Sequence, residues 1–337
     1  MEKIKHIEIN NFKSIKHLEI NGCNRINVFI GMPNAGKSNI LEALSLIGLQ
    51  HKFFNFDQLK NYVRFEHKNE LYFEGNINSS FSVKANDNEV RVLLVNNTLI
   101  IRQSLNGETI NSIDIEIKTN KNSLREIKKE FNQIKKYLFS TFKVKHRLNI
   151  FESDSSNLNY PFGENLGNII SNNSNVRNYV NELFLSNNLK LLIDKSSDEL
   201  KIFKEFQDGT VFTLPYSMIA DTLQRLIFYK ASILSNENSV LLFEEPEAHC
   251  FEPYILEFTN SVKYDKNDNQ FFIVTHSDFI IQEFLRDEES KNNTNIYLVN
   301  NINGETKVKL LNKNKNEDVY ELGMNPFFNF ENLWENN

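Results

Sequence analysis

Apolar and polar residues alternate at the start of the chain, and this alternation predicts two short β-strands. The apolar positions are Ile4, Ile7, Ile9, Phe12, Ile15, Leu18 and Ile20. We expect the turn between the strands near Asn10 and Asn11. A continuous apolar run at residues 26–30 follows, which is typical of a buried central strand. Helical spacing then begins and predicts a helix that ends near Gly48, with an apolar face made of Ile40, Leu41, Leu44 and Ile47.

Residues 70–118 alternate again between polar turns and predict an antiparallel β-meander that begins at Leu71–Phe73. From Ser123 the apolar period becomes helical. The elements expected after it are a loop over 150–178, helical segments around 176–193, a hairpin near 200–214, a helix at 218–234, a strand at 239–243, a helix at 252–263, a strand at 271–275 and closing strands at 296–300 and 306–311. Buried strands that alternate with helices indicate an α/β fold.

Composition excludes several classes of protein. The 337 residues are 40% apolar and 24% charged, as in a soluble protein with one large core. No apolar run approaches the roughly 18 residues of a membrane span, and the first residues lack a signal-peptide core, so we expect a cytoplasmic protein without a membrane segment. The two cysteines, Cys23 and Cys250, suit a reducing compartment. A net charge of −6 opposes a wholly basic surface but allows a local basic groove.

Residues 31–38, GMPNAGKS, match the pattern G-x-x-x-x-G-K-[ST] between the predicted strand and helix. Backbone N–H groups of such a loop bind phosphates, with Lys37 at the β- and γ-phosphates and the Ser38 hydroxyl on Mg²⁺. Strand, loop and helix in this order make a chance match improbable, so we predict an ATP site. The residues expected at the nucleotide are Gly31, Pro33, Asn34, Ala35, Gly36, Lys37, Ser38 and Asn39.

Acidic and imidazole side chains follow two later strands. Glu244 and Glu245 come after the buried run that ends at Phe243, where we expect Glu244 to join Ser38 as a metal ligand and Glu245 to act as general base. The alternative is a solvated acidic loop. His276 ends the next strand, where it is either a structural histidine or a sensor of the γ-phosphate. Catalytic roles for Glu245 and His276 are the interpretation that we carry forward.

These motifs together resemble the ABC-type ATPases of the RecF/SMC/OLD group, with an AAA_15- or AAA_21-like domain. The resemblance covers roughly residues 1–75 and 215–311 and rests on four segments: residues 7–15 (IEINNFKSI), the phosphate loop, residues 243–249 (FEEPEAH) and residues 274–277 (VTHS). It implies a P-loop ABC-type ATPase head, with a mixed central sheet, an antiparallel β lobe and a mainly helical insertion. The implied segments are 1–118, 119–198 and 199–337.

The resemblance also implies that a second subunit completes the site through a signature motif. Here the corresponding residues are Ala220–Arg225, in which Gln224 and Arg225 match the family while its serine and both glycines are missing. Asp221 stands where it repels a γ-phosphate, so the contact from the other subunit is in doubt; Ser217 and Arg225 are substitutes. Glu244 replaces the usual aspartate, and Gln58 is a weak candidate for the Q-loop glutamine.

Residues 219–229 and 243–249 are similar to the ATPase subunit of PARIS anti-phage systems. This similarity implies a homo-oligomeric scaffold that holds a separate effector nuclease, expected to be of the TOPRIM type, and releases it when a phage-encoded trigger protein is sensed. The helix from Ser123 is too short for an SMC-like arm, and the stretch after His276 is short for a fused nuclease.

Two further segments have open interpretations. Residues 121–147 are the most basic stretch and form either a DNA or acidic-partner contact or a solvated helix face. The apolar residues of the C-terminal tail pack on the core or dock a neighbouring subunit; they are Pro326, Phe327, Phe328, Phe330 and Trp334.

The alternatives to a defence scaffold are a RecF-like repair ATPase that dimerises on DNA with ATP, and a nucleotide-locked structural module.

Overall fold

The computed structural model describes residues 3–48, 59–116, 124–125, 139–142, 156–185, 188–194 and 199–336. The chain divides into two compact units. Unit 1 comprises Met1–Thr141, Leu242–Glu245 and Gln270–Asn337, and unit 2 comprises Phe142–Leu241 and Pro246–Asn269. The division into segments 1–118, 119–198 and 199–337 stays a prediction. Within the described ranges, no helix is long and apolar enough to cross a membrane.

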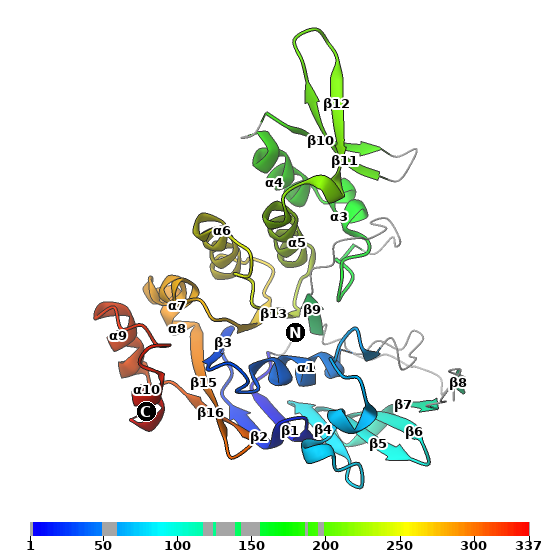
Figure 1. Ribbon diagram of the computed structural model, residues 1–337, viewed down its shortest axis with the longest axis vertical. Helices are drawn as coiled ribbons and strands as arrows, with labels where there is room; N and C mark the ends of the chain where they lie inside the picture. The colour runs from blue at the N-terminus through cyan, green and yellow to red at the C-terminus, as the bar shows by residue number, and fades with distance from the viewer. Residues whose placement is uncertain are drawn as a thin grey trace. The chain divides into compact units, whose positions relative to one another are not determined.

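A six-stranded sheet contains the buried strand that the apolar run at 26–30 predicts (Figure 1). In spatial order its strands are β16 (Glu305–Leu310), β15 (Thr294–Ile302), β3 (Ile26–Gly31), β14 (Gln270–Val274), β13 (Val240–Glu244) and β9 (Phe139–Phe142). Strand β3 pairs in parallel with β14 and β15, and β15 pairs antiparallel with β16. All of β3 is buried, as expected for a parallel strand covered on both faces. The mixed central sheet is confirmed.

A seven-stranded antiparallel sheet forms the β lobe of unit 1 (Figure 1). Its strands in spatial order are β2 (Ile15–Asn21), β1 (His6–Phe12), β4 (Phe81–Ala85), β5 (Asn88–Val95), β6 (Thr98–Leu105), β7 (Glu108–Glu116) and β8 (Leu124–Arg125). The predicted meander is confirmed from residue 81 onward. The N-terminal hairpin continues the same sheet, because β1 pairs with both β2 and β4.

The turn of the N-terminal hairpin was expected at Asn10 and Asn11, and this expectation is wrong. Strand β1 continues to Phe12, which pairs with Ile15, so the turn lies at residues 13–14. Asn11 has a positive φ of 55° but remains within the strand. Two asparagines are a turn signal in sequence, but here the cross-strand pairing of Phe12 extends the strand past them.

The expected strand at Leu71–Phe73 is also wrong. These residues belong to two short 3₁₀ turns, η1 (Lys68–Leu71) and η2 (Phe73–Gly75), with Tyr72 between them. Tyr72 is buried and its ring lies 5.3 Å from that of Phe81, centroid to centroid. Three consecutive apolar residues, of which Leu71 and Tyr72 are buried, give the same short apolar signal in a turn as in a strand, so the pattern cannot separate the two.

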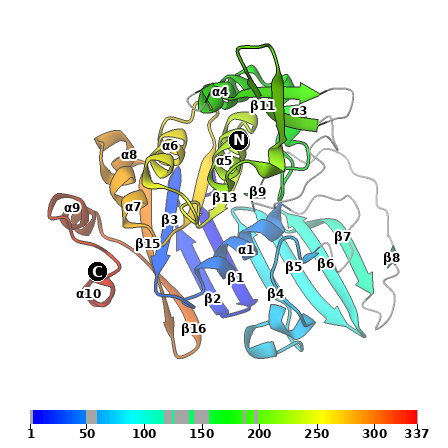
Figure 2. The same cartoon turned by 45° about the horizontal axis from the view of Figure 1, so that its top comes forward.

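Helix α1 (Lys37–Ile47) has the bounds that the apolar spacing predicts, and it contacts strands of both sheets in unit 1 (Figure 2). Four further helices of unit 1 were not predicted from the sequence. They are α7 (Asp278–Leu285), α8 (Glu288–Asn292), α9 (Lys313–Glu321) and α10 (Phe330–Glu335). They are short, and a segment of five to nine residues holds too few turns for a clear helical period.

Unit 2 contains helices and a small antiparallel sheet. The helices are α3 (Leu166–Asn172), α4 (Ser174–Leu185), α5 (Asp221–Ser235) and α6 (Glu252–Lys263), with the 3₁₀ turn η3 (Tyr216–Met218) before α5. The strands are β10 (Lys190–Asp194), β11 (Glu199–Glu205) and β12 (Val211–Pro215). Helix α6 and the β11–β12 hairpin agree with the sequence, whereas α3 and β10 replace an expected loop and an expected helix.

The helix expected from Ser123 is wrong at Leu124 and Arg125, the two residues of it that the structure describes. Leu124 pairs with Ile115 and Arg125 with Asp114, so these two residues form strand β8. The rest of that helix, most of the basic stretch 121–147 and Gln58 lie outside the described residues.

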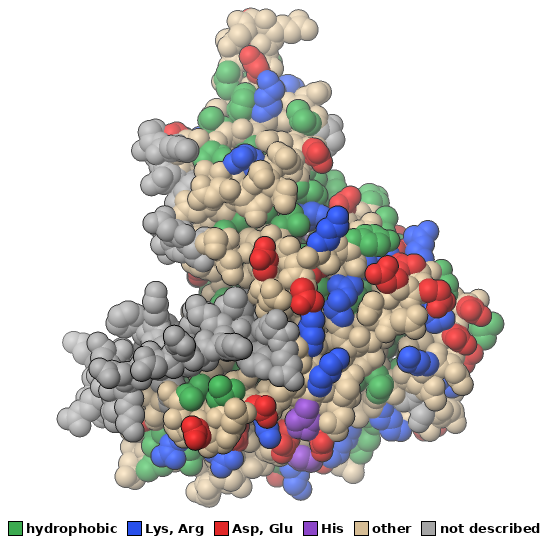
Figure 3. Space-filling view, turned by 180° about the vertical axis from the view of Figure 1, so that it is seen from behind, with side chains coloured by type: hydrophobic (Ala, Val, Ile, Leu, Met, Phe, Trp, Pro, Cys, Tyr) green, Lys and Arg blue, Asp and Glu red, His purple; other side chains and the backbone are tan. Residues whose placement is uncertain are grey.

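On the face shown in Figure 3, Lys and Arg side chains lie among Asp and Glu side chains, as the net charge of −6 suggests.

Candidate functional site

The loop 31–38 joins β3 to α1 and requires glycine at both of its glycine positions. A Cβ atom at Gly31 would lie 2.0 Å from the carbonyl oxygen of Val299 on the neighbouring strand β15. Gly36 has a φ of 94°, and a Cβ atom there would lie 2.0 Å from Thr306 Oγ1. The loop backbone therefore approaches its neighbours more closely than any other residue type allows.

Helix α1 begins at Lys37, within the last two residues of this loop, and its N-terminus suits an anion. Among the described residues, no side chain caps the helix, and its first turn contains no acidic residue. The first N–H groups of a helix have no partner inside the helix and carry the positive end of its dipole. An N-terminus of this kind, preceded by a glycine loop, binds phosphate groups.

Lys37 lies folded over its own loop. Its ammonium group donates hydrogen bonds to the carbonyl oxygens of Gly31 and Met32, both at 3.0 Å, and the side chain is buried. These contacts hold the positive charge above the loop, next to the N–H groups of the helix. The lysine therefore adds a cation to the anion-binding backbone at the position that the motif predicts.

A chain of hydrogen bonds attaches the loop to two other parts of unit 1. Asn39 Nδ2 donates to Ser14 Oγ at 2.7 Å, Ser14 Oγ lies 2.7 Å from Thr306 Oγ1, and Thr306 Oγ1 donates to the carbonyl oxygen of Ala35 at 3.0 Å. Because the Thr306 proton goes to Ala35, Ser14 is the donor in the middle bond. The side chain of Asn39, which we expected at the nucleotide, thus faces the β1–β2 turn.

Removing the Thr306 hydroxyl should loosen this loop. Thr306→Val keeps the shape of a buried side chain but removes the acceptor of the Ser14 hydroxyl proton and the donor to the carbonyl oxygen of Ala35, so we expect a loss of about 1–3 kcal/mol in the free energy of unfolding. ATP affinity should fall as well. Urea unfolding and titration calorimetry measure the two effects, and Thr306→Ser, which keeps the hydroxyl, is the control. Equal stability of the two variants would contradict the prediction.

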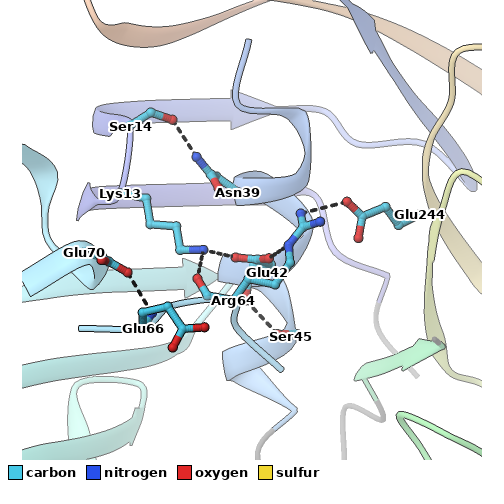
Figure 4. Close-up of polar contacts among 9 residues, drawn as sticks. All are labelled: Lys13, Ser14, Asn39, Glu42, Ser45, Arg64, Glu66, Glu70 and Glu244. Atoms are coloured by element: carbon cyan, nitrogen blue, oxygen red, sulfur yellow. Dashed lines mark hydrogen bonds and ion pairs between the residues drawn. The ribbon is translucent and has the colours of Figure 1, made fainter. Parts of the chain in front are cut away.

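Glu244, the last residue of β13, takes part in an ion chain that starts on α1 (Figure 4). Arg64 Nη2 lies 2.9 Å from Glu244 Oε1, and Arg64 Nε lies 2.6 Å from Glu42 Oε1. Lys13 also pairs with Glu42, and its ammonium donates to the carbonyl oxygen of Arg64 at 2.6 Å. The chain of charges therefore links the β1–β2 turn, the middle of α1 and the predicted metal ligand.

Sequence reasoning missed this ion chain. Glu42 is only 2% exposed and has two cationic partners, which is what a buried carboxylate requires. Burial lowers the pKa of Arg64, but Glu244 and Glu42 raise it more, so the net pKa lies above its ordinary value and the guanidinium stays charged. The available signal was Glu42 itself, an acid between the apolar positions Leu41 and Leu44 of α1.

Glu245 and His276 lie next to each other, just after the adjacent strands β13 and β14. Glu245 has a positive φ of 46° and its N–H donates to the carbonyl oxygen of Val274 at 2.8 Å, which ties it to the end of β14. Its Oε1 lies 3.6 Å from His276 Nε2. A positive φ in a non-glycine residue is a strained conformation that the surrounding structure must hold, and such residues are common in active sites.

The charge state of His276 follows from its surroundings. Burial lowers the pKa of His276, the positive charge of Lys37 lowers it further, and Glu245 opposes both. The net pKa lies below the ordinary value of 6.5, so the imidazole is neutral at pH 7. A neutral imidazole offers one N–H donor and one acceptor nitrogen. Lys37, Glu245 and His276 thus form one electrostatic cluster at the end of the phosphate loop.

Comparisons with known proteins show the family of the chain. Residues 26–282 match a family model described as "AAA domain, putative AbiEii toxin, Type IV TA system". The chain belongs to the AAA_21 family. Its matched region contains the phosphate loop, both acids and the histidine. None of the curated proteins matches the chain.

Solved structures show the fold of this AAA_21 protein. The SMC head bound to the C-winged helix domain of ScpA is 15% identical, with a TM-score of 0.50 over 93% of this chain and 99% of that chain. A Pyrococcus furiosus SMC head with an extended coiled coil, bound to the C-terminal domain of ScpA, is 14% identical, with a TM-score of 0.50 over 96% and 99%. The chain therefore shares the fold of these SMC heads, and the expected fold class, a P-loop ATPase head, is confirmed.

The family implies a nucleotide and, typically, Mg²⁺, and the residues at the site fit both. Ser38 on the first turn of α1 and Glu244 at the end of β13 supply hydroxyl and carboxylate oxygens, which are the hard donors that Mg²⁺ prefers. Arg64 contacts Oε1 of the same carboxylate. A metal ion on Glu244 would share the carboxylate with Arg64 or displace the guanidinium.

The signature candidates belong to unit 2, at the start of α5. Arg225 Nε lies 2.7 Å from Asp221 Oδ2, one helical turn away, and Gln224 Nε2 donates to the carbonyl oxygen of Ile219 at 2.9 Å. Ser217 lies in η3 and is exposed. The negative charge of Asp221, expected to repel a γ-phosphate, is thus offset by Arg225 within the same subunit.

Proposed function

We propose that the chain hydrolyses ATP at the cluster formed by the phosphate loop, Glu245 and His276. The observation that carries this proposal is the 3.6 Å separation of Glu245 Oε1 and His276 Nε2 beside the charge of Lys37. A carboxylate, a neutral imidazole and a lysine over an anion-binding loop are the groups that phosphoryl transfer to water requires. The intact Glu245 and His276 oppose the alternative of a nucleotide-locked module that barely hydrolyses ATP.

Each residue has a defined part in the proposed reaction. The loop N–H groups and Lys37 bind the β- and γ-phosphates, while Ser38 and Glu244 would hold Mg²⁺, which would offset phosphate charge. Glu245 accepts a proton from the attacking water as the water oxygen bonds to the γ-phosphorus and the bond to the β-phosphate oxygen breaks. The N–H of His276 donates to the γ-phosphate. The products are ADP and inorganic phosphate, with the proton left on Glu245.

The broader role that we infer is an oligomeric sensor and scaffold in anti-phage defence. The support is the similarity of residues 219–229 and 243–249 to the PARIS ATPase subunit, and the mention of a toxin system in the family's description. In this role the heads associate with one another and hold a separate effector nuclease until a phage-encoded trigger protein is sensed. Asp221, Gln224 and Arg225 are the residues proposed to face the nucleotide of the adjacent subunit.

The native mass of a Glu245→Gln protein tests this role. The variant is co-expressed with the product of the neighbouring gene and weighed by light scattering and native mass spectrometry, with and without Mg·ATP; Lys37→Ala is the control that should not respond to ATP. We expect a large assembly that retains the neighbouring protein. A monomer that only dimerises with ATP and holds no partner would instead favour the RecF-like repair ATPase, in which case DNA binding becomes the next measurement.

A further inference from the structure

The end of the chain forms a compact structure next to the candidate site. Asn325 Oδ1 accepts hydrogen bonds from the backbone N–H groups of Phe327 and Phe328, at 3.0 and 3.2 Å, and Asn329 N–H donates to the carbonyl oxygen of Asn325 at 3.2 Å. These bonds close a tight turn just before α10. The turn fixes the backbone of Phe327, so the direction of its side chain is determined locally.

Helix α10 is held in place by contacts with β16 that do not involve His276. Lys309 of β16 donates to the carbonyl oxygen of Trp334 at 2.6 Å, and its ammonium lies 4.8 Å from the centroid of the indole ring. The rings of Phe330 and Trp334 stack at 6.3 Å, and Leu333 is buried. The position of the C-terminal segment, residues 324–336, is therefore held by contacts that do not involve His276.

Phe327 uses this position to contact the candidate sensor. Its ring stacks on the imidazole of His276, with centroids 6.2 Å apart and an interplanar angle of 26°. This separation lies within the range of about 4.5–7 Å for offset-stacked rings. The neighbouring Phe328 is 92% exposed and serves no such purpose. The adjacent Phe327 and Phe328 thus differ in environment, since Phe327 is partly buried against His276 and Phe328 is exposed.

We propose that Phe327 is a positioning residue for His276, through which the C-terminal segment is coupled to the nucleotide. This inference rests on the proposed function, since it takes His276 as the group that contacts the γ-phosphate. Phe327 covers one face of the imidazole and limits rotation of the ring, so that Nε2 stays on the side of Glu245. A γ-phosphate that draws the imidazole toward itself changes this contact, and the change reaches α10 through the turn at Asn325.

Steady-state kinetics test the positioning role. We expect Phe327→Ala to lower kcat about 3- to 10-fold, the equivalent of one aromatic contact, with less than a twofold change in the Kd for ATP. Phe327→Tyr should restore kcat because it keeps the ring. Phe328→Ala, the adjacent exposed aromatic, is the matched control and should behave like the wild type. A Phe327→Ala protein with wild-type kcat overturns the proposal.

A double-mutant cycle separates positioning from a general loss of structure. In a His276→Ala background, Phe327→Ala should have no further effect, because the ring it positions is gone. Additive losses in kcat overturn the positioning role. A His276→Ala protein that keeps wild-type kcat overturns the proposed sensor, which is a different result and is visible in the single variant.

The fluorescence of Trp334, the only tryptophan in the chain, is a readout that does not depend on activity. Its fluorescence should be the same in apo wild-type and Phe327→Ala proteins, which shows that α10 remains seated on Lys309. Mg·ATP added to the Glu245→Gln protein should change the fluorescence, and this change should disappear when Phe327→Ala is added. A nucleotide response that persists in the double variant overturns the coupling.

Discussion

Lys37→Ala is expected to abolish useful ATP binding, with a rise in the Kd of about 100-fold or more. Lys37 is the only basic residue of the loop 31–38, and its ammonium lies over the carbonyl oxygens of Gly31 and Met32. Without it, the loop N–H groups meet the triphosphate alone, and the charge-assisted contacts to the β- and γ-phosphates are lost. Titration calorimetry with Mg·ATP, or a fluorescent ATP analogue, measures the change.

The matched control is Lys16→Ala. Lys16 is an exposed lysine of β2, so its removal changes the net charge by the same amount without touching the loop. Circular dichroism and the unfolding midpoint should be close to wild type in the control. If Lys37→Ala binds ATP with wild-type affinity, the nucleotide does not lie on this loop and the site assignment is wrong.

Glu245→Gln is expected to bind ATP normally but to hydrolyse it about 10²- to 10⁴-fold more slowly. Glutamine has the size of glutamate and keeps its hydrogen bonds, but it cannot accept the proton of the attacking water. Single-turnover phosphate release measures the chemical step, and calorimetry shows that the Kd stays within about threefold of wild type. The variant should accumulate in the ATP-bound form.

A glutamate outside the cluster provides the control for this substitution. Glu252 is exposed in the first turn of α6 in unit 2, and Glu252→Gln should leave both kcat and Kd unchanged. Wild-type turnover in Glu245→Gln would remove Glu245 as the base, and Glu244→Gln would then be the variant to compare. Loss of ATP binding in Glu245→Gln would show instead that the carboxylate organises the loop.

The two adjacent acids, Glu244 and Glu245, contact different groups. Glu244 is paired with the guanidinium of Arg64, at 2.9 Å, whereas Glu245 faces the neutral imidazole of His276, at 3.6 Å. This difference supports Glu245 as the base and Glu244 as the ligand, an assignment that adjacent glutamates in a sequence leave open.

Much of the candidate site follows from local sequence. A continuous apolar run, a glycine loop and a helical apolar face give β3, the loop 31–38 and α1, because each depends on neighbouring residues and on backbone preferences that glycine and lysine express directly. The same reasoning correctly predicted α6 and the buried strand that ends at the two acids, β13. These features need no knowledge of what lies across the fold.

Only the tertiary structure decides which distant side chains complete the site. Ser14 and Thr306 hold the loop, Arg64 pairs with Glu244, and Phe327 stacks on His276, although each pair is separated by dozens to hundreds of residues. The turn at residues 13–14 and the strand at Leu124–Arg125 likewise arise from pairing partners rather than from propensity. Hydrogen bonds, ion pairs and ring contacts act over only a few ångströms. They therefore form between distant residues only when the tertiary structure brings those residues together, and local sequence patterns do not predict which residues these are.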